Sequence, residues 1–266
     1  MIDTHCHMTF PDFEFPRMPG GVASVLERAR ANGVSGLISI STTTTDARKA
    51  LAIAKQFDRV WCSAGVHPLY SDQGPHNWAE LEEVARDPKC VAFGELGLDN
   101  HYKDPAATLQ RTVLEEQLGV ISNLHSQGVR KPLIIHCRDA FDDTISILQA
   151  SGIDPTRMVF HCFTGTADNA RAVLNFGAFI SFTGVVTYKN AANVREAVAL
   201  LPQNRFMVET DAPFLSPEPH RSTRPCEPWM TRLTLEAIAT IRNEPFDTLH
   251  HAINTTTSNF FGIDAR

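Results

Sequence analysis

Two histidines near the start of the chain, His5 and His7, are separated by a single residue. In an extended strand alternate side chains point to the same face, so both imidazoles would lie on one side. Imidazole is the commonest protein ligand for metal ions, and two rings on one face could begin a metal site. Taken alone, the pair is also consistent with ordinary strand-end histidines, so the metal hypothesis depends on further ligands.

Further residues that could do chemistry follow at the expected C-terminal ends of later strands. They are His67, Glu95, Asp99, His136, Arg138, His161, Glu209 and Asp211. With the first pair, His136, His161, Glu95 and Asp211 make four imidazoles and two carboxylates. Such a set can hold two divalent ions, which clamp the attacking and leaving oxygens in hydrolysis. Glu95 suits a bridging position because a carboxylate has two oxygens, and the ligands admit Mg, Mn or Zn.

Short apolar runs that alternate with amphipathic stretches indicate βα units around a parallel sheet. The expected strands are 1–7, 34–41, 60–68, 90–99, 132–137, 158–163, 178–184 and 205–211. Eight units predict an α/β fold, a (β/α)8 TIM barrel, with a doubly wound open sheet as the alternative. We expect a single domain over residues 1–266, with C-terminal helices over 229–243 and 246–261 that close the barrel.

Alternation along the strands predicts which side chains face the active site of such a barrel. His5 and His7 would point inward and Cys6 outward. The same parity places Cys137 and Cys162 beneath the helices, where a thiol serves as a small apolar packing group.

Local signals predict where helices begin and where the chain is irregular. Asp46 and Asp168 stand where helix N-caps are expected. The threonines at 42–45 are expected to form the entry to a helix. Residues 212–228 contain five prolines and predict a long irregular loop after the last strand, on the active face.

Composition restricts the class of protein. With 266 residues, 43% of them hydrophobic, and a net charge of −6, the chain resembles an ordinary globular protein without a broad basic surface for nucleic acid. No secretory signal or membrane-spanning run is evident, and six scattered cysteines form no CxxC motif. We therefore expect a cytoplasmic protein with no membrane association and no obligatory protein partner.

Six blocks together resemble one family. They are "HCH" (5–7), "GVHP" (65–68), "GELGLD" (94–99), "IIHCRDA" (134–140), "HCFTG" (161–165) and "ETDAPFLSPEPHR" (209–221). In this order they resemble the TatD family of metal-dependent deoxyribonucleases, within the amidohydrolase-like metal barrels. The resemblance implies a DNA-cleaving hydrolase, with exonuclease activity from the 3′ end described for the family.

The same resemblance implies how the ligands divide between two ions. One ion would be held by His5, His7, Glu95 and Asp211. Glu95 would bridge to a second ion held by His136 and His161.

The chain departs from the family pattern at three places. Asn100 and His101 follow "GLD", where many relatives carry aromatic residues, and Cys226 stands where an asparagine usually precedes Glu-Pro. Residues 129–131 are more polar than in relatives. The first two departures lie near the expected substrate cleft, so they leave substrate preference open.

Roles can be assigned to several residues. Asp211 is expected to accept a proton from the attacking water as general base, with Glu95 the second catalytic carboxylate. Substrate contacts are expected from Arg138, Arg221, His67, His101 and Tyr102. Arginine would bind phosphate, and Tyr102 would stack on a base.

Three of these positions keep alternative interpretations. His67 either lines the pocket or only stabilises its loop. Asp99 either tethers the loop after the fourth strand or touches substrate. Glu209 either orients ligands from behind or forms an ion pair in the barrel core.

The hypotheses for the reaction differ in the bond that is cleaved. The first is hydrolysis of DNA phosphodiesters, in single strands or at strand ends, by a metal-activated water. The second keeps the same centre but hydrolyses D-aminoacyl-tRNA or another ester or amide. The third is a non-catalytic metal-binding barrel.

Overall fold

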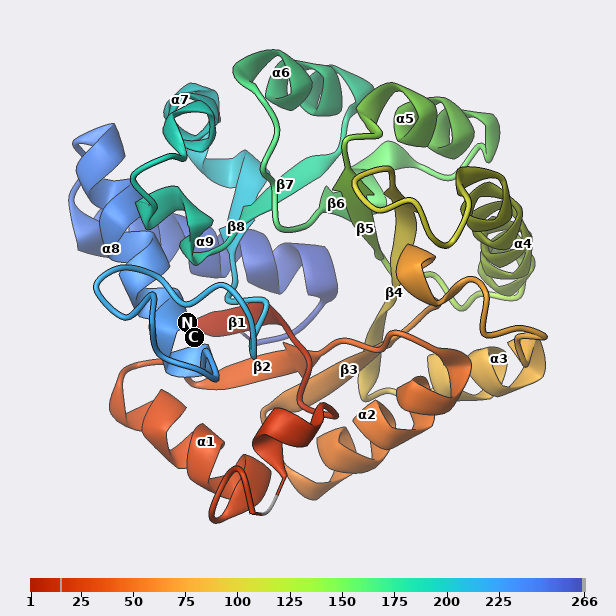
Figure 1. Ribbon diagram of the computed structural model, residues 1–266, viewed down its shortest axis with the longest axis horizontal. Helices are drawn as coiled ribbons and strands as arrows, with labels where there is room; N and C mark the ends of the chain where they lie inside the picture. The colour runs from red at the N-terminus through yellow and green to blue at the C-terminus, as the bar shows by residue number, and fades with distance from the viewer. Residues whose placement is uncertain (15, 265–266) are drawn as a thin grey trace. The chain divides into compact units, whose positions relative to one another are not determined.

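The computed structural model describes residues 1–14 and 16–264 of the chain. Within them eight strands form one sheet in sequence order, with a helix between successive strands (Figure 1). The strands are β1 Ile2–Cys6, β2 Gly36–Ser39, β3 Val60–Ala64, β4 Cys90–Asp99, β5 Leu133–Arg138, β6 Met158–Phe160, β7 Phe179–Phe182 and β8 Phe206–Val208. Parallel strands in this order, with intervening helices, define a (β/α)8 barrel, so the predicted fold class is confirmed.

The described residues contain nine α-helices. They are α1 Gly21–Ala31, α2 Thr44–Gln56, α3 Trp78–Arg86, α4 Ala107–Ser126, α5 Phe141–Ala150, α6 Ala167–Phe176, α7 Ala192–Leu200, α8 Thr231–Arg242 and α9 Phe246–Phe261. The two predicted C-terminal helices are present as α8 and α9. Among these helices none combines the length and the apolar character needed to cross a bilayer.

The chain divides into two compact units whose segments interleave along the sequence. The first contains residues 1–39 and 162–171, and its third segment begins at residue 180. The second contains residues 40–161 and 172–179. The single domain expected over residues 1–266 stays a prediction.

In the first unit, β1 pairs in parallel with β2 and β7 with β8. A further parallel bridge joins Cys6 to Ala212, just beyond β8. Helix α9 packs against both β1 and β8. The segment that follows Ala212 contains no α-helix before α8, as its prolines predicted.

In the second unit, β4 lies between β3 and β5, and every residue of β4 is buried. Its register with β5 places Gly97 opposite His136 and Asp99 opposite Arg138, so polar residues of both strands share one end. Gly65 allows the chain to approach β4 closely, because a Cβ there would stand 2.5 Å from the backbone of Gly94.

Both predicted aspartate caps are wrong. The N-cap of α2 is Thr43, whose side chain accepts a hydrogen bond from the amide of Asp46 at 3.0 Å. Asp46 lies in the first turn and accepts from the amide of Thr42 at 3.0 Å. Likewise Asp168 lies within the first turn of α6, after Thr166. A threonine takes the cap in α2 and leaves the carboxylate near the positive end of the helix dipole.

The predicted orientation of the cysteines is confirmed for two and wrong for the third. Cys6 is buried, and its thiol donates to the carbonyl of Ile38 at 3.5 Å. Cys137 is buried beside Thr144 of α5, and burial raises its pKa to about 12. Cys162 instead has a left-handed φ of 45° and is only half-buried. Because β6 ends at Phe160, strand alternation does not extend to Cys162.

Candidate metal centre

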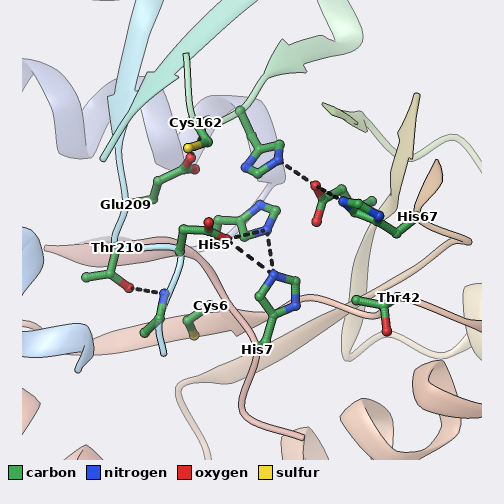
Figure 2. Close-up of polar contacts among 12 residues, drawn as sticks. His5, Cys6, His7, Thr42, His67, Cys162, Glu209 and Thr210 are labelled. Atoms are coloured by element: carbon green, nitrogen blue, oxygen red, sulfur yellow. Dashed lines mark hydrogen bonds and ion pairs between the residues drawn. The ribbon is translucent and has the colours of Figure 1, made fainter. Parts of the chain in front are cut away.

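The first cluster of possible ligands consists of His5, His7 and Asp211. The Nε2 atoms of His5 and His7 are 3.3 Å apart, and they lie 3.6 and 3.3 Å from Oδ1 of Asp211. Figure 2 shows the two rings meeting through their Nε2 atoms, with the side chain of Cys6 directed away from them. The inward orientation predicted for the two histidines is therefore correct.

The backbone holds this cluster together at the junction of β1 with the segment after β8. The amide of Asp211 donates to the carbonyl of His5 at 2.9 Å, and the amide of His7 donates to the carbonyl of Ala212 at 2.7 Å. Asp211 has a left-handed φ of 62°. This conformation is unfavourable for a residue with a Cβ and is kept where the surrounding structure requires it.

A buried carboxylate that the sequence analysis missed supports the same junction. Oδ1 of Asp3 accepts from the amides of Thr210 and His5 at 2.9 and 3.3 Å, and Oδ2 accepts from the Thr210 hydroxyl at 2.5 Å. Burial raises the pKa of Asp3 to about 8. The hydrogen bonds lower this pKa, but their effect is smaller than that of burial. Asp3 shares strand parity with His5 and His7, and that signal could have identified it.

Glu209 lies behind the first cluster and fixes two neighbouring segments. Its Oε1 accepts from the amide of Cys162 at 2.7 Å, and its Oε2 accepts from the hydroxyl of Thr4 at 3.3 Å. Figure 2 shows its carboxylate beside Cys162. The carboxylate thus joins β1, β8 and the segment after β6, which agrees with an orienting position.

The second cluster gathers around Glu95 on β4. Its Oε1 lies 2.6 Å from Nδ1 of His136 and 2.6 Å from Nε2 of His161. These two nitrogens are 3.3 Å apart. The Nε2 of His67 approaches the same oxygen at 3.2 Å. Three imidazoles therefore converge on a single carboxylate oxygen.

Asp99 determines which nitrogen of His136 faces this cluster. Its Oδ2 lies 3.0 Å from Nε2 of His136, on the opposite side of the ring from Glu95. Burial would raise the pKa of Asp99, but His136 and two loop amides lower it below its usual value. Burial would likewise lower the pKa of His136, but Asp99 and Glu95 raise it. An ionised Asp99 holds the proton on Nε2 and leaves Nδ1 as the possible ligand.

His67 has the opposite arrangement. Its Nδ1 accepts a hydrogen bond from the amide of Leu69 at 3.0 Å. In the neutral ring the proton must then lie on Nε2, the nitrogen directed at Glu95. His67 is therefore suited to donate a hydrogen bond in the pocket, and it is less suited to ligate a metal there.

The predicted substrate residues other than His67 lie on the loop after β4, at the end of β5 and on the segment after β8. Tyr102 and His101 are exposed on the loop after β4, and the Arg138 guanidinium lies 5.4 Å from the centre of the Tyr102 ring. In the first unit, the Arg221 guanidinium stacks on Tyr188 at 3.7 Å. The substrate contacts assigned to these residues stay predictions.

The spacing of the donor atoms in each cluster can be compared with the spacing of ligands around a divalent ion. For bonds of about 2.05 Å to nitrogen or oxygen, donors at the corners of a tetrahedron are roughly 3.3 Å apart. The separations of 3.3, 3.6 and 3.3 Å in the first cluster match this spacing. In the second, the 3.3 Å between His136 and His161 matches it, while the carboxylate oxygen lies closer to both nitrogens, at 2.6 Å.

Comparison with known proteins agrees with this geometry. Residues 2–262 match the family model described as TatD related DNase. The chain is 33% identical to the uncharacterized metal-dependent hydrolase YcfH of Escherichia coli (strain K12), over 100% of this chain and 97% of the relative. It is 32% identical to the 3′-5′ ssDNA/RNA exonuclease TatD of Klebsiella pneumoniae (strain 342), over 90% of this chain and 91% of the relative.

A solved structure shows the same fold. The TatD homologue YJJV of Escherichia coli K12 superposes with a TM-score of 0.88 at 28% identity, covering 99% of this chain and 98% of that one. The barrel, its clusters of possible histidine and carboxylate ligands and its relatives together define a metal-dependent hydrolase. Since the family model spans nearly the whole chain, the protein belongs to the TatD-related DNase family.

Proposed function

We propose that the chain is a nuclease that uses two divalent ions, Mg, Mn or Zn. In this proposal His5, His7, Glu95 and Asp211 would hold one ion, and Glu95 would be shared with a second ion held by His136 and His161. The convergence of donor atoms within each cluster is the observation that carries the proposal. A shared Glu95 is supported by the chemistry of a carboxylate, whose two oxygens can serve two ions.

The proposed substrate is a single nucleic acid strand, degraded from its 3′ end. The family model is described as a DNase, and the Klebsiella relative carries the name of a 3′-5′ exonuclease of single-stranded DNA and RNA. The proposed location is the cytoplasm, and the six free thiols are compatible with its reducing conditions.

The side chains can be given roles in phosphodiester hydrolysis. Bound divalent ions would lower the pKa of a water and polarise a phosphoryl oxygen. Asp211 accepts the proton of the attacking water, since its Oδ1 lies beside both imidazoles of the first cluster and its side chain is 15% exposed. His67 donates a hydrogen bond from Nε2 to the substrate, and Arg138 and Arg221 contact phosphates.

Metal reconstitution tests this function. The protein is stripped with a chelator, reloaded with one metal at a time, and given end-labelled single-stranded DNA, duplex DNA, RNA and D-aminoacyl-tRNA. We expect metal-dependent release of nucleotides from the 3′ end of single strands. Asp211→Asn should slow single-turnover cleavage about 10³-fold, because the general base is lost.

Two results would overturn the proposal. One is turnover by Asp211→Asn close to that of the unaltered protein. The other is hydrolysis confined to D-aminoacyl-tRNA, which would assign the same centre to ester cleavage. Metal content is measured in each preparation, so that loss of an ion is not mistaken for loss of the base.

A further inference from the structure

The loop between β4 and α4, residues 100–106, is held by the buried side chain of Gln110. Gln110 accepts from the amide of Asp99 at 2.8 Å and donates to the carbonyls of Asp99 and Pro105 at 2.9 and 2.8 Å. It therefore fixes both ends of the loop. The amide of Asn100 adds a hydrogen bond to the carbonyl of Arg138 at 2.9 Å.

This fixed loop presents an aromatic ring to solvent. Tyr102 is 51% exposed, which is unusual for a large apolar side chain in this protein. The ring of His101 meets it edge-on, with centres 5.0 Å apart, and the Arg138 guanidinium lies 5.4 Å from its centre. Within residues 1–14 and 16–264, Arg138 forms no ion pair, so its guanidinium is available to a ligand.

One carboxylate connects this ring to the second metal cluster. Oδ1 of Asp99 accepts from the amides of His101 and Tyr102 at 2.9 and 3.3 Å, while Oδ2 contacts Nε2 of His136 at 3.0 Å. Arg138 lies two residues beyond His136 at the end of β5. Asp99 thus positions both the loop that carries Tyr102 and the proposed metal ligand His136. Strand β5 carries both His136 and Arg138.

We propose that Tyr102 and Arg138 form a stacking site for one unpaired nucleobase and its phosphate. The base would lie on the exposed face of Tyr102, and the guanidinium of Arg138 would bind the adjoining phosphate. Because a base within a duplex already stacks on its neighbours, this site selects single strands. The proposal rests on the proposed nuclease function and identifies residues that determine its choice of strand.

Abasic scanning tests the site. Fluorescent thymidine 12-mers carry a tetrahydrofuran residue, which lacks a base, at each of the last four 3′ positions in turn. Their dissociation constants are measured by fluorescence anisotropy with two metal-loaded proteins. One carries Asp211→Asn alone, and the other carries Asp211→Asn together with Tyr102→Ala. At one position, removal of the base should weaken binding roughly 5- to 150-fold when Tyr102 is present. With Tyr102→Ala, removal of that base should have no further effect.

Matched variants separate stacking from general damage. Tyr102→Phe and Tyr102→Trp retain an aromatic face and should retain the sensitivity to base removal. Leu109→Ala truncates another exposed apolar side chain, 39% exposed on α4, and should bind every 12-mer as the unaltered protein does. The dissociation constant could instead depend on the position of the missing base in the same way with tyrosine and with alanine at position 102. That result would overturn the stacking site.

Cleavage of the same 12-mers separates this proposal from the nuclease function. Suppose that cleavage depends on metal, but the effect of each missing base is the same with tyrosine and with alanine at position 102. That result would retain the nuclease function and reject the stacking site. Binding that depends on Tyr102, without cleavage by any metal-loaded preparation, would retain the site and reject the nuclease. Absence of both binding and cleavage would reject both.

Discussion

At the scale of single residues, the contact made by one ring nitrogen of a histidine determines the role of the other. That other nitrogen can either bind a metal ion or donate a hydrogen bond. His136 contacts Asp99 through Nε2, which leaves Nδ1 toward Glu95 as a possible ligand. His67 accepts from the amide of Leu69 through Nδ1, so its Nε2 carries a proton. Two imidazoles that approach the same carboxylate oxygen therefore have different chemistry.

This difference predicts the behaviour of His67→Ala. The variant should bind as much metal as the unaltered protein but cleave about 10²-fold more slowly, because a hydrogen-bond donor to the substrate is lost. Metal content by mass spectrometry and single-turnover rates check both parts. His67→Gln, which retains an N–H donor, should recover part of the rate. Loss of one bound ion in His67→Ala would instead make His67 a ligand.

A second residue-scale prediction concerns Asp99→Asn. Without the carboxylate, His136 is no longer held in the tautomer that presents Nδ1 to the cluster. We expect the affinity for the ion at this cluster to fall about 10- to 100-fold. Competition with a chromophoric chelator measures it. Asp104→Asn on the same exposed loop is the matched control, and an equal loss of affinity there would contradict the role of Asp99.

At the scale of elements, the sequence predicted the strands and the orientation of residues within them better than the segments beyond them. Parity placed His5 and His7 correctly, although the register of β1 with β2 shifts between Asp3 and Cys6 and β1 ends at Cys6. The same rule failed at Cys162, which lies past the end of β6 in a left-handed conformation. No periodic signal could reveal the role of Gln110, because its partners are backbone groups of the irregular loop that precedes α4.

One element-scale prediction concerns Arg242 at the end of α8. Its guanidinium donates to the carbonyls of Val198 and Leu201, both at 2.7 Å, and joins α8 to the end of α7. Arg242→Ala should lower the free energy of unfolding by about 2–4 kcal/mol, since charge-assisted hydrogen bonds to buried carbonyls are lost. Urea unfolding at pH 7 measures the loss.

The same residue gives this region a dependence on pH. Arg242 and Gln203 hold the pKa of Glu244 below its usual value of 4.5. A lowered carboxyl pKa adds stability above the unfolded pKa, and that stability is lost as pH falls through the folded pKa. As the pH falls below 4.5, the free energy of unfolding of Arg242→Ala should therefore decrease by less than that of the unaltered protein. Arg111→Ala, which breaks only an exposed pair with Glu115, should change the free energy of unfolding by under about 1 kcal/mol.

At the scale of the whole molecule, the order of the elements could be predicted because each βα unit carries its own periodicity. The candidate ligands could be predicted because five strand ends carry residues with metal-binding side chains. Asp3 and Thr210, which join β1 to the segment after β8, illustrate what local patterns leave out. Asp3 and Thr210 are 207 residues apart in the sequence, so only the fold brings them together.

Metal binding should therefore stabilise the folded chain as a whole. The ligands lie on segments that begin at residue 5 and end at residue 211, and the unfolded chain cannot gather them. Ligand at 100 times its dissociation constant adds about 2.7 kcal/mol of stability. For a chain of this size such an increment raises Tm by roughly 5–10 °C. Calorimetry with and without chelator measures the shift. If each cluster holds its own ion, His5→Gln and His136→Gln should each remove part of it, and a Tm indifferent to metal would exclude both sites.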